Sequence, residues 1–174
     1  MKDGLDSLSA VVPSAIASAG VRTGARPRGP RPDRPLGKQG TQVLGRVSLF
    51  EGLPKRHLRA LAERADEVAF RKGERIVEAG ERGGAFYVIL EGQAKVTKGS
   101  RTLARLSAGD FFGELALLDG GPRLASVTAT SPVRAIRIFK RSFDRLVAEE
   151  PAVAAKMLRV LAARLRDAER SVTG

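Results

Sequence analysis

The chain has 174 residues, no cysteine and one histidine, and its 31 Lys and Arg against 19 Asp and Glu give a formal net charge of +12. This length suits one domain with a buried core. The lack of cysteine excludes disulfides, thiolate zinc sites and cysteine nucleophiles, and a single histidine argues against a metalloenzyme or a histidine-dependent triad. No apolar run approaches the roughly 20 residues of a membrane span, and Asp3 and Asp6 stand where a secretory signal carries positive charge. We expect a cytoplasmic protein that is not an enzyme and holds no metal or cofactor.

The positive charge is shared between an N-terminal arm and the rest of the chain. Residues 1–46 carry eight Lys or Arg against three Asp, a net +5, and residues 47–174 carry 23 against 16, a net +7. The sequence from 1 to 44 has no sustained apolar period and is rich in arginine, glycine and proline, which predicts a disordered basic arm. A solvated linker is the favoured interpretation, since no aromatic residue is interleaved for base stacking. Contact with nucleic acid through the arginines is the alternative.

A helix and then a series of strands are predicted to open a domain that spans residues 45–174. Leu58, Leu61 and Ala65 recur at helical spacing. His57 on this helix is expected at the surface, because no nucleophile or carboxylate pair accompanies it. From Val68 to Phe139, short β-rich runs alternate with glycine turns about every ten residues, which is typical of a small roll or barrel. Its expected core residues are Phe70, Ile76, Phe86, Val88, Leu90, Val96, Leu103 and Leu106.

The most informative segment runs from Gly113 to Val127. Good helix formers at 114–118 are followed by Asp-Gly-Gly-Pro, which predicts a single helical turn. The free N–H groups of such a turn can hold an anion, and Gly113 lets a ligand approach the backbone. Arg123 can donate two hydrogen bonds to one phosphate, and Glu114 is an acceptor suited to a sugar hydroxyl. We therefore interpret this segment as a pocket for a sugar phosphate.

Two helices are predicted at the C-terminal end. The first spans Ser142 to Glu149, and Pro151 suits the first position of a longer one. A seam with alternating spacings of four and three on the long helix could be covered by a partner helix, which predicts a homodimer; its members are Ala154, Leu158, Leu161, Leu165, Ala168 and Val172. A neighbouring stripe, Val153, Met157 and Val160, is expected to pack on the roll. The alternative is that both stripes bury the helix on its own domain.

The segment from Gly113 to Val127 resembles the phosphate-binding cassette of the cyclic nucleotide-binding domain family. That cassette reads Gly-Glu-x-Ala-Leu, a short spacer, then Pro-Arg-x-Ala-Ser/Thr-Val, and every fixed position is present. The similarity extends from about Leu49 to about Val172. It implies an α+β fold: an antiparallel β-roll of the double-stranded β-helix or jelly-roll type, with an N-terminal helix, a short cassette helix and two C-terminal helices.

The resemblance also implies roles for individual residues. Glu114 would bind the ribose 2′-hydroxyl and Arg123 the cyclic phosphate, while nearby backbone N–H groups complete the anion site. Leu124 has no hydroxyl to meet a guanine amino group, unlike the Thr or Ser of members that favour cyclic GMP, so cyclic AMP is the expected ligand and cyclic GMP the alternative. In an ungapped match to the catabolite activator, the hydroxyl pair that meets the purine falls at Ala168 and Glu169, which leaves the purine cap open. The predicted ligand-binding residues are Val96, Leu103, Gly113, Glu114, Leu115, Ala116, Arg123, Leu124 and Ala125, the first two against the nucleotide.

The expected function is regulatory. Binding of a cyclic nucleotide would change the arrangement of the C-terminal helices. Catabolite activator-like members continue into a winged helix-turn-helix, whereas this sequence ends at Gly174, so we expect the response to pass to a downstream protein, the arm or the dimer. Two alternatives are a ligand-free scaffold or oligomerisation module, in which Glu114 and Arg123 form an internal ion pair, and a nucleic-acid-binding protein that uses the basic arm.

Overall fold

The computed structural model describes residues 34–173, so the predicted arm lies outside the described residues up to position 33. The described part begins with short elements: β1 (Arg34–Pro35), the 3-10 turn η1 (Gly37–Gln39), α2 (Gly40–Gly45), the 3-10 turn η2 (Ser48–Phe50) and α3 (Lys55–Ala62). Leu44 is completely buried, and a Cβ at Gly40 would lie 2.9 Å from the Cβ of Ala62 in α3. Residues 34–44 therefore pack on the domain, and the expected arm boundary at residue 44 is too late.

Helix α3 is also shorter than predicted. Ala65 is the first residue of β2 (Ala65–Phe70), where it pairs with Ile138. Its burial, which the helical spacing suggested, comes from the sheet instead.

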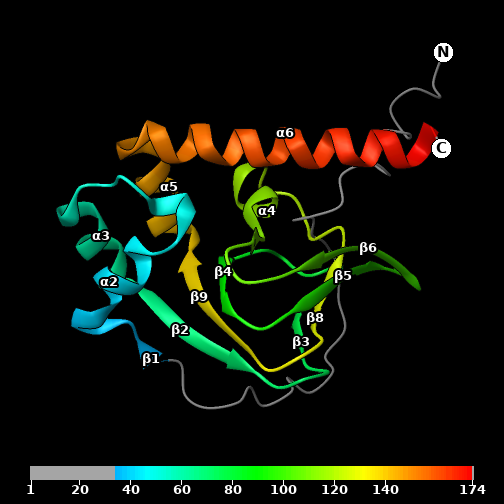
Figure 1. The fold of residues 1–174 in the computed structure, drawn as a ribbon, viewed down its shortest axis with the longest axis horizontal. Helices are drawn as coiled ribbons and strands as arrows, with labels where there is room; N and C mark the ends of the chain where they lie inside the picture. The colour runs from blue at the N-terminus through cyan, green and yellow to red at the C-terminus, as the bar shows by residue number, and fades with distance from the viewer. Residues whose placement is uncertain (1–33, 174) are drawn as a thin grey trace.

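The strands form two antiparallel sheets (Figure 1). One sheet has the order β1-β2-β9-β4-β7 and the other β3-β8-β5-β6. The chain crosses repeatedly between the sheets along its length, as the predicted β-roll requires. The remaining strands are β3 (Arg75–Val77), β4 (Ala85–Glu91), β5 (Ala94–Lys98), β6 (Arg101–Leu106), β7 (Phe111–Phe112), β8 (Ser126–Ala129) and β9 (Val133–Phe139).

The core has two parts. One lies within the roll, and the other lies between the roll and the helices, where the ring of Phe86 packs on those of Phe111 and Phe143 with centroids 5.6 and 5.4 Å away. Of the eight residues predicted for the core, Ile76, Phe86, Val88, Val96 and Leu106 are buried, and Phe70, Leu90 and Leu103 are partly buried.

Three further helices complete the domain: α4 (Glu114–Leu118), α5 (Lys140–Glu149) and α6 (Pro151–Thr173). Figure 1 shows α6 as a long helix that crosses one side of the molecule above α4 and α5. Val153 and Met157 are buried against the core, which confirms the stripe predicted to pack on the roll. Leu158, on the other stripe, is 66% exposed. In the part of the chain described, no helix is long and apolar enough to cross a membrane.

Candidate functional site

Close contacts fix the chain at both ends of the short helix α4. Gly113 precedes it with φ of 90°, and a Cβ at this position would lie 2.9 Å from the carbonyl oxygen of Ala85 and 3.2 Å from Nη1 of Arg123. At the other end, Oδ1 of Asp119 accepts a hydrogen bond of 2.7 Å from the N–H of Gly121. The predicted single turn is confirmed, and the glycine before it makes room for the arginine.

Arg123 is 4% exposed and incompletely partnered. Its Nη2 donates to the carbonyl oxygen of Ala85 at 3.2 Å, whereas its Nη1 has no hydrogen-bond partner among residues 34–173. Its main chain is fixed, because its N–H donates to Glu81 O at 3.1 Å and its carbonyl accepts from Gly80 N–H at 2.9 Å. Burial lowers the pKa of Arg123, but a guanidinium stays protonated at neutral pH. The site therefore presents a desolvated cation with a spare donor.

Glu114 is completely buried on the same short helix. Its Oε1 forms an ion pair with Nη1 of Arg164 at 3.5 Å, a distance that is long for a hydrogen bond, and its Oε2 has no partner within the described residues. Burial raises the pKa of Glu114 to about 8, although the Arg164 charge opposes that rise. Burial therefore favours the protonated carboxyl before a ligand arrives. The internal ion pair between Glu114 and Arg123, expected for a ligand-free scaffold, does not form, since each residue contacts other groups.

Arg164 connects α6 to this site and was missed as a functional residue. Its Nη2 donates to the carbonyl oxygen of Phe111 at 3.0 Å, and its guanidinium lies 4.6 Å from the centre of the Phe111 ring. Burial lowers the pKa of Arg164. The sequence did hold a signal: Val153, Met157, Val160 and Arg164 follow spacings of four, three and four. A charged residue on the stripe that faces the core needs a partner there.

The other predicted site residues surround α4 or lie in the roll. Ala116 and Ala125 are buried, Leu115 is partly buried, and Leu124 is 43% exposed beside Arg123. Val96 is buried in the roll, and Leu103 packs partly buried against the same core. They are core residues here, and their contact with a nucleotide stays a prediction.

Ser126 has a structural task in the cassette. Its buried Oγ accepts hydrogen bonds from the N–H of Ala79 at 2.9 Å and from Nη1 of Arg75 at 3.1 Å. These bonds fasten the loop after β3 to the start of β8. These two hydrogen bonds explain why the cassette pattern has a hydroxyl side chain, Ser or Thr, at the position of Ser126.

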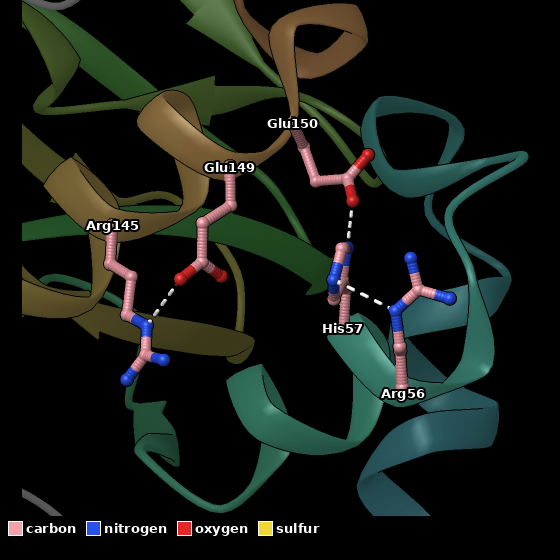
Figure 2. A network of polar contacts seen from close by, with 5 residues as sticks. All are labelled: Arg56, His57, Arg145, Glu149 and Glu150. Atoms are coloured by element: carbon pink, nitrogen blue, oxygen red, sulfur yellow. Dashed lines mark hydrogen bonds and ion pairs between the residues drawn. The ribbon is translucent and has the colours of Figure 1, made fainter.

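His57 lies in a separate polar cluster between α3 and the junction of α5 with α6 (Figure 2). Its Nε2 accepts from Nε of Arg56 at 3.2 Å, and its Nδ1 contacts a carboxylate oxygen of Glu150. The sequence analysis expected His57 at the surface, whereas its imidazole is partly buried. The cavity beside it measures about 30 Å³, room for a water molecule rather than a nucleotide. This cluster fastens helices and is distinct from the site at α4.

Comparison with known proteins agrees with this geometry. Residues 67–150 match the family model of the cyclic nucleotide-binding domain. The chain is 32% identical over 130 residues to the CRP-like cAMP-activated global transcriptional regulator of Mycobacterium tuberculosis, which covers 72% of this chain and 58% of that protein.

Solved structures show the same likeness. The catabolite activator protein of Thermus thermophilus superposes with a TM-score of 0.63 at 31% identity, over 72% of this chain and 61% of that one. The regulatory domain of Toxoplasma gondii PKA, solved with cAMP, gives 0.62 at 29% identity, over 70% and 48%. The chain belongs to the cyclic nucleotide-binding domain family, and its domain is of the catabolite activator type. It spans somewhat more than half the length of the curated relative from Mycobacterium tuberculosis.

Proposed function

We propose that this protein is a cyclic AMP sensor with a regulatory rather than a catalytic role. One observation carries the proposal: Nη1 of Arg123 and Oε2 of Glu114 are buried side-chain atoms without a hydrogen-bond partner in the described part of the chain. One is a cationic hydrogen-bond donor and the other is an acceptor, and both lie beside the short helix α4. Buried polar atoms of this kind are rare in native proteins and call for a ligand or another explanation.

A cyclic nucleotide supplies what both atoms lack. Its phosphate anion would accept from Nη1 of Arg123 and from N–H groups at the start of α4 and near Ala125. The ribose 2′-hydroxyl would donate to Oε2 of Glu114. Because folding has already removed both side chains from water, the ligand gains these bonds without that desolvation cost.

Arg164 gives the ligand a route to α6. A hydroxyl donor at Glu114 favours the ionised carboxylate, which strengthens the attraction between Glu114 and Arg164. The ligand would therefore hold α6 more firmly over α4, and an α6 already in place would tighten ligand binding by the same factor. Lys140 at the start of α5 links α4 to α5, since its Nζ donates to the carbonyl oxygen of Leu117 at 3.2 Å.

The exposed seam of α6 suits a second copy of this chain. Leu158 is 66% exposed, and Leu161 and Leu165 are only partly buried. Two such helices side by side would cover these side chains. We include a homodimer through α6 in the proposal, with an unidentified downstream protein receiving the response.

Cyclic AMP is the proposed ligand over cyclic GMP. The residue after Arg123 is Leu124, which can neither donate nor accept a hydrogen bond, so it offers nothing to the amino group that distinguishes guanine.

Calorimetric titration of the wild-type protein with cyclic AMP and cyclic GMP tests the proposal. Saturable binding of cyclic AMP, with stronger protection of α6 amides from hydrogen exchange in its presence, is expected. Arg164→Ala should retain much of the binding at Arg123 while losing most of the added α6 protection. A folded wild-type protein that binds neither nucleotide at millimolar concentration would leave the scaffold alternative standing.

A further inference from the structure

A second pocket lies on the other side of Arg164. It measures about 340 Å³ and is formed by η2, the turn at Gly109 and Asp110, and the middle of α6. This volume is within the range of roughly 300 to 1,000 Å³ that small-molecule sites occupy. Its walls combine apolar and cationic side chains, namely Leu49, Phe111, Val160, Lys156, Arg159 and Arg164.

The cations of this pocket differ in how far they are engaged. Nζ of Lys156 donates to the carbonyl oxygens of Ser48 at 3.1 Å and Glu51 at 2.6 Å, which leaves one of its three N–H groups. Arg159 is exposed and makes no hydrogen bond or ion pair with any described residue. Arg159 is therefore the donor most ready to meet an incoming group.

The local charge balance favours an anion with two charges. Three cations face one carboxylate, Asp110, whose Oδ2 already accepts from the N–H of Ser107 at 2.8 Å. The adjoining pocket, which shares Ser48 and Gly109, is closer to charge balance: it is lined by the exposed Arg46 and by Arg134, which pairs with Glu67 at 2.7 Å and Glu91 at 2.5 Å. The positive excess is therefore larger in the pocket that contains Arg159.

We propose that this pocket binds a small organic phosphate monoester, with its phosphate against Arg159 and Lys156 and its apolar body against Leu49 and Val160. The site is separate from the one at Arg123. Within residues 34–173 they are linked by Arg164, whose guanidinium contacts Glu114 and also lines this pocket. An anion here would draw that guanidinium away from Glu114 and so weaken cyclic AMP binding. This last effect rests on the proposed function, whereas binding in the pocket does not.

Phenyl phosphate is a suitable probe, because it joins a dianionic head to an apolar ring. Calorimetry should use the Arg123→Met variant, so that the probe cannot bind at the cyclic nucleotide site. Saturable binding is expected. Adding Arg159→Glu should lower the affinity at least about tenfold, and adding Arg166→Glu, the same charge change at an exposed position of α6 outside the pocket, should leave it nearly unchanged. No saturable binding, or an equal effect of both charge changes, would overturn the site.

Two further measurements test the apolar wall and the coupling. Inorganic phosphate should bind at least about tenfold more weakly than phenyl phosphate, and equal affinity would remove Leu49 and Val160 from the site. In the wild-type protein, rising phenyl phosphate should raise the Kd for cyclic AMP to a plateau, and Arg159→Glu should abolish that rise. An increase without a plateau means direct competition at Arg123 and refutes the coupling, as does no increase. If cyclic AMP does not bind at all, the proposed function fails while the Arg123→Met titration still decides the pocket.

Discussion

Replacing Arg123 by methionine should separate ligand binding from stability. Methionine keeps an unbranched apolar stem of similar length but has neither the charge nor the N–H donors of arginine. In the wild type, Arg123 is 4% exposed, its Nη2 donates to the carbonyl oxygen of Ala85, and its Nη1 has no partner among the residues described. The buried guanidinium is therefore incompletely hydrogen-bonded before the ligand arrives.

The expected magnitudes follow from those contacts. In the complex, Arg123 can donate two charge-assisted hydrogen bonds to the phosphate, each worth about 1.5 to 3 kcal/mol. The variant should therefore lose roughly 3 to 6 kcal/mol of binding free energy, at least about a hundredfold in Kd. In the free protein, the carbonyl of Ala85 loses a donor, which costs about 1 to 3 kcal/mol, while removal of a buried unpartnered N–H gains a similar amount. The free energy of unfolding should change by no more than about 1 kcal/mol.

Calorimetry with cyclic AMP and urea unfolding of the ligand-free protein measure the two quantities. Arg101→Met, at an exposed arginine of β6, is the matched control and should change neither. Binding at wild-type affinity in a folded Arg123→Met variant would refute the role of Arg123. A loss of more than 3 kcal/mol in unfolding free energy would show that the guanidinium is a structural group instead.

Burial raises the pKa of Glu114 from 4.5 to about 8, so between these pH values the folded protein keeps a proton that the unfolded chain releases. The free energy of unfolding without ligand should therefore fall as pH rises from 4.5 to 8. Urea unfolding of Glu114→Gln should show a weaker dependence of this free energy on pH, and the same dependence as in the wild type would contradict the shift. Leu161→Glu should dissociate the dimer, because it places two carboxylates in an apolar interface. It should also weaken cyclic AMP binding, because the ligand site is coupled to α6. Sedimentation with and without nucleotide checks both effects, and a wild-type monomer at tens of micromolar would exclude the dimer. Leu124→Thr should improve cyclic GMP binding by at most about 1 to 1.5 kcal/mol, the value of one neutral hydrogen bond; tighter wild-type binding of cyclic GMP than of cyclic AMP in calorimetry would contradict the inferred preference.

Local sequence patterns were enough to predict a small roll or barrel, the single turn of α4 and the buried stripe of α6, and the family resemblance implied the antiparallel β-roll. A short run of helix formers between Gly113 and Asp119 leaves little choice of backbone, and the spacing of Val153 and Met157 defines one face of a helix wherever that helix lies. The pattern around Ala65 was misleading, because a buried alanine after α3 satisfies a helical spacing and a strand equally well. Only the pairing of Ala65 with Ile138 decides between them.

The partners of the charged site residues depended on tertiary structure. Glu114 and Arg164 are 50 positions apart, and the spacing of α6 says which face is buried but not what lies opposite it. The same holds for Ala85, whose carbonyl oxygen engages Arg123 only because Gly113 has no Cβ between them. His57 meets Glu150 because α3 packs against the junction of α5 and α6. Residue types at short spacing therefore determine the chemistry that the site offers. Long-range packing decides which charged groups are paired within the protein and which are left for a ligand, because burial and pairing are properties of the assembled domain.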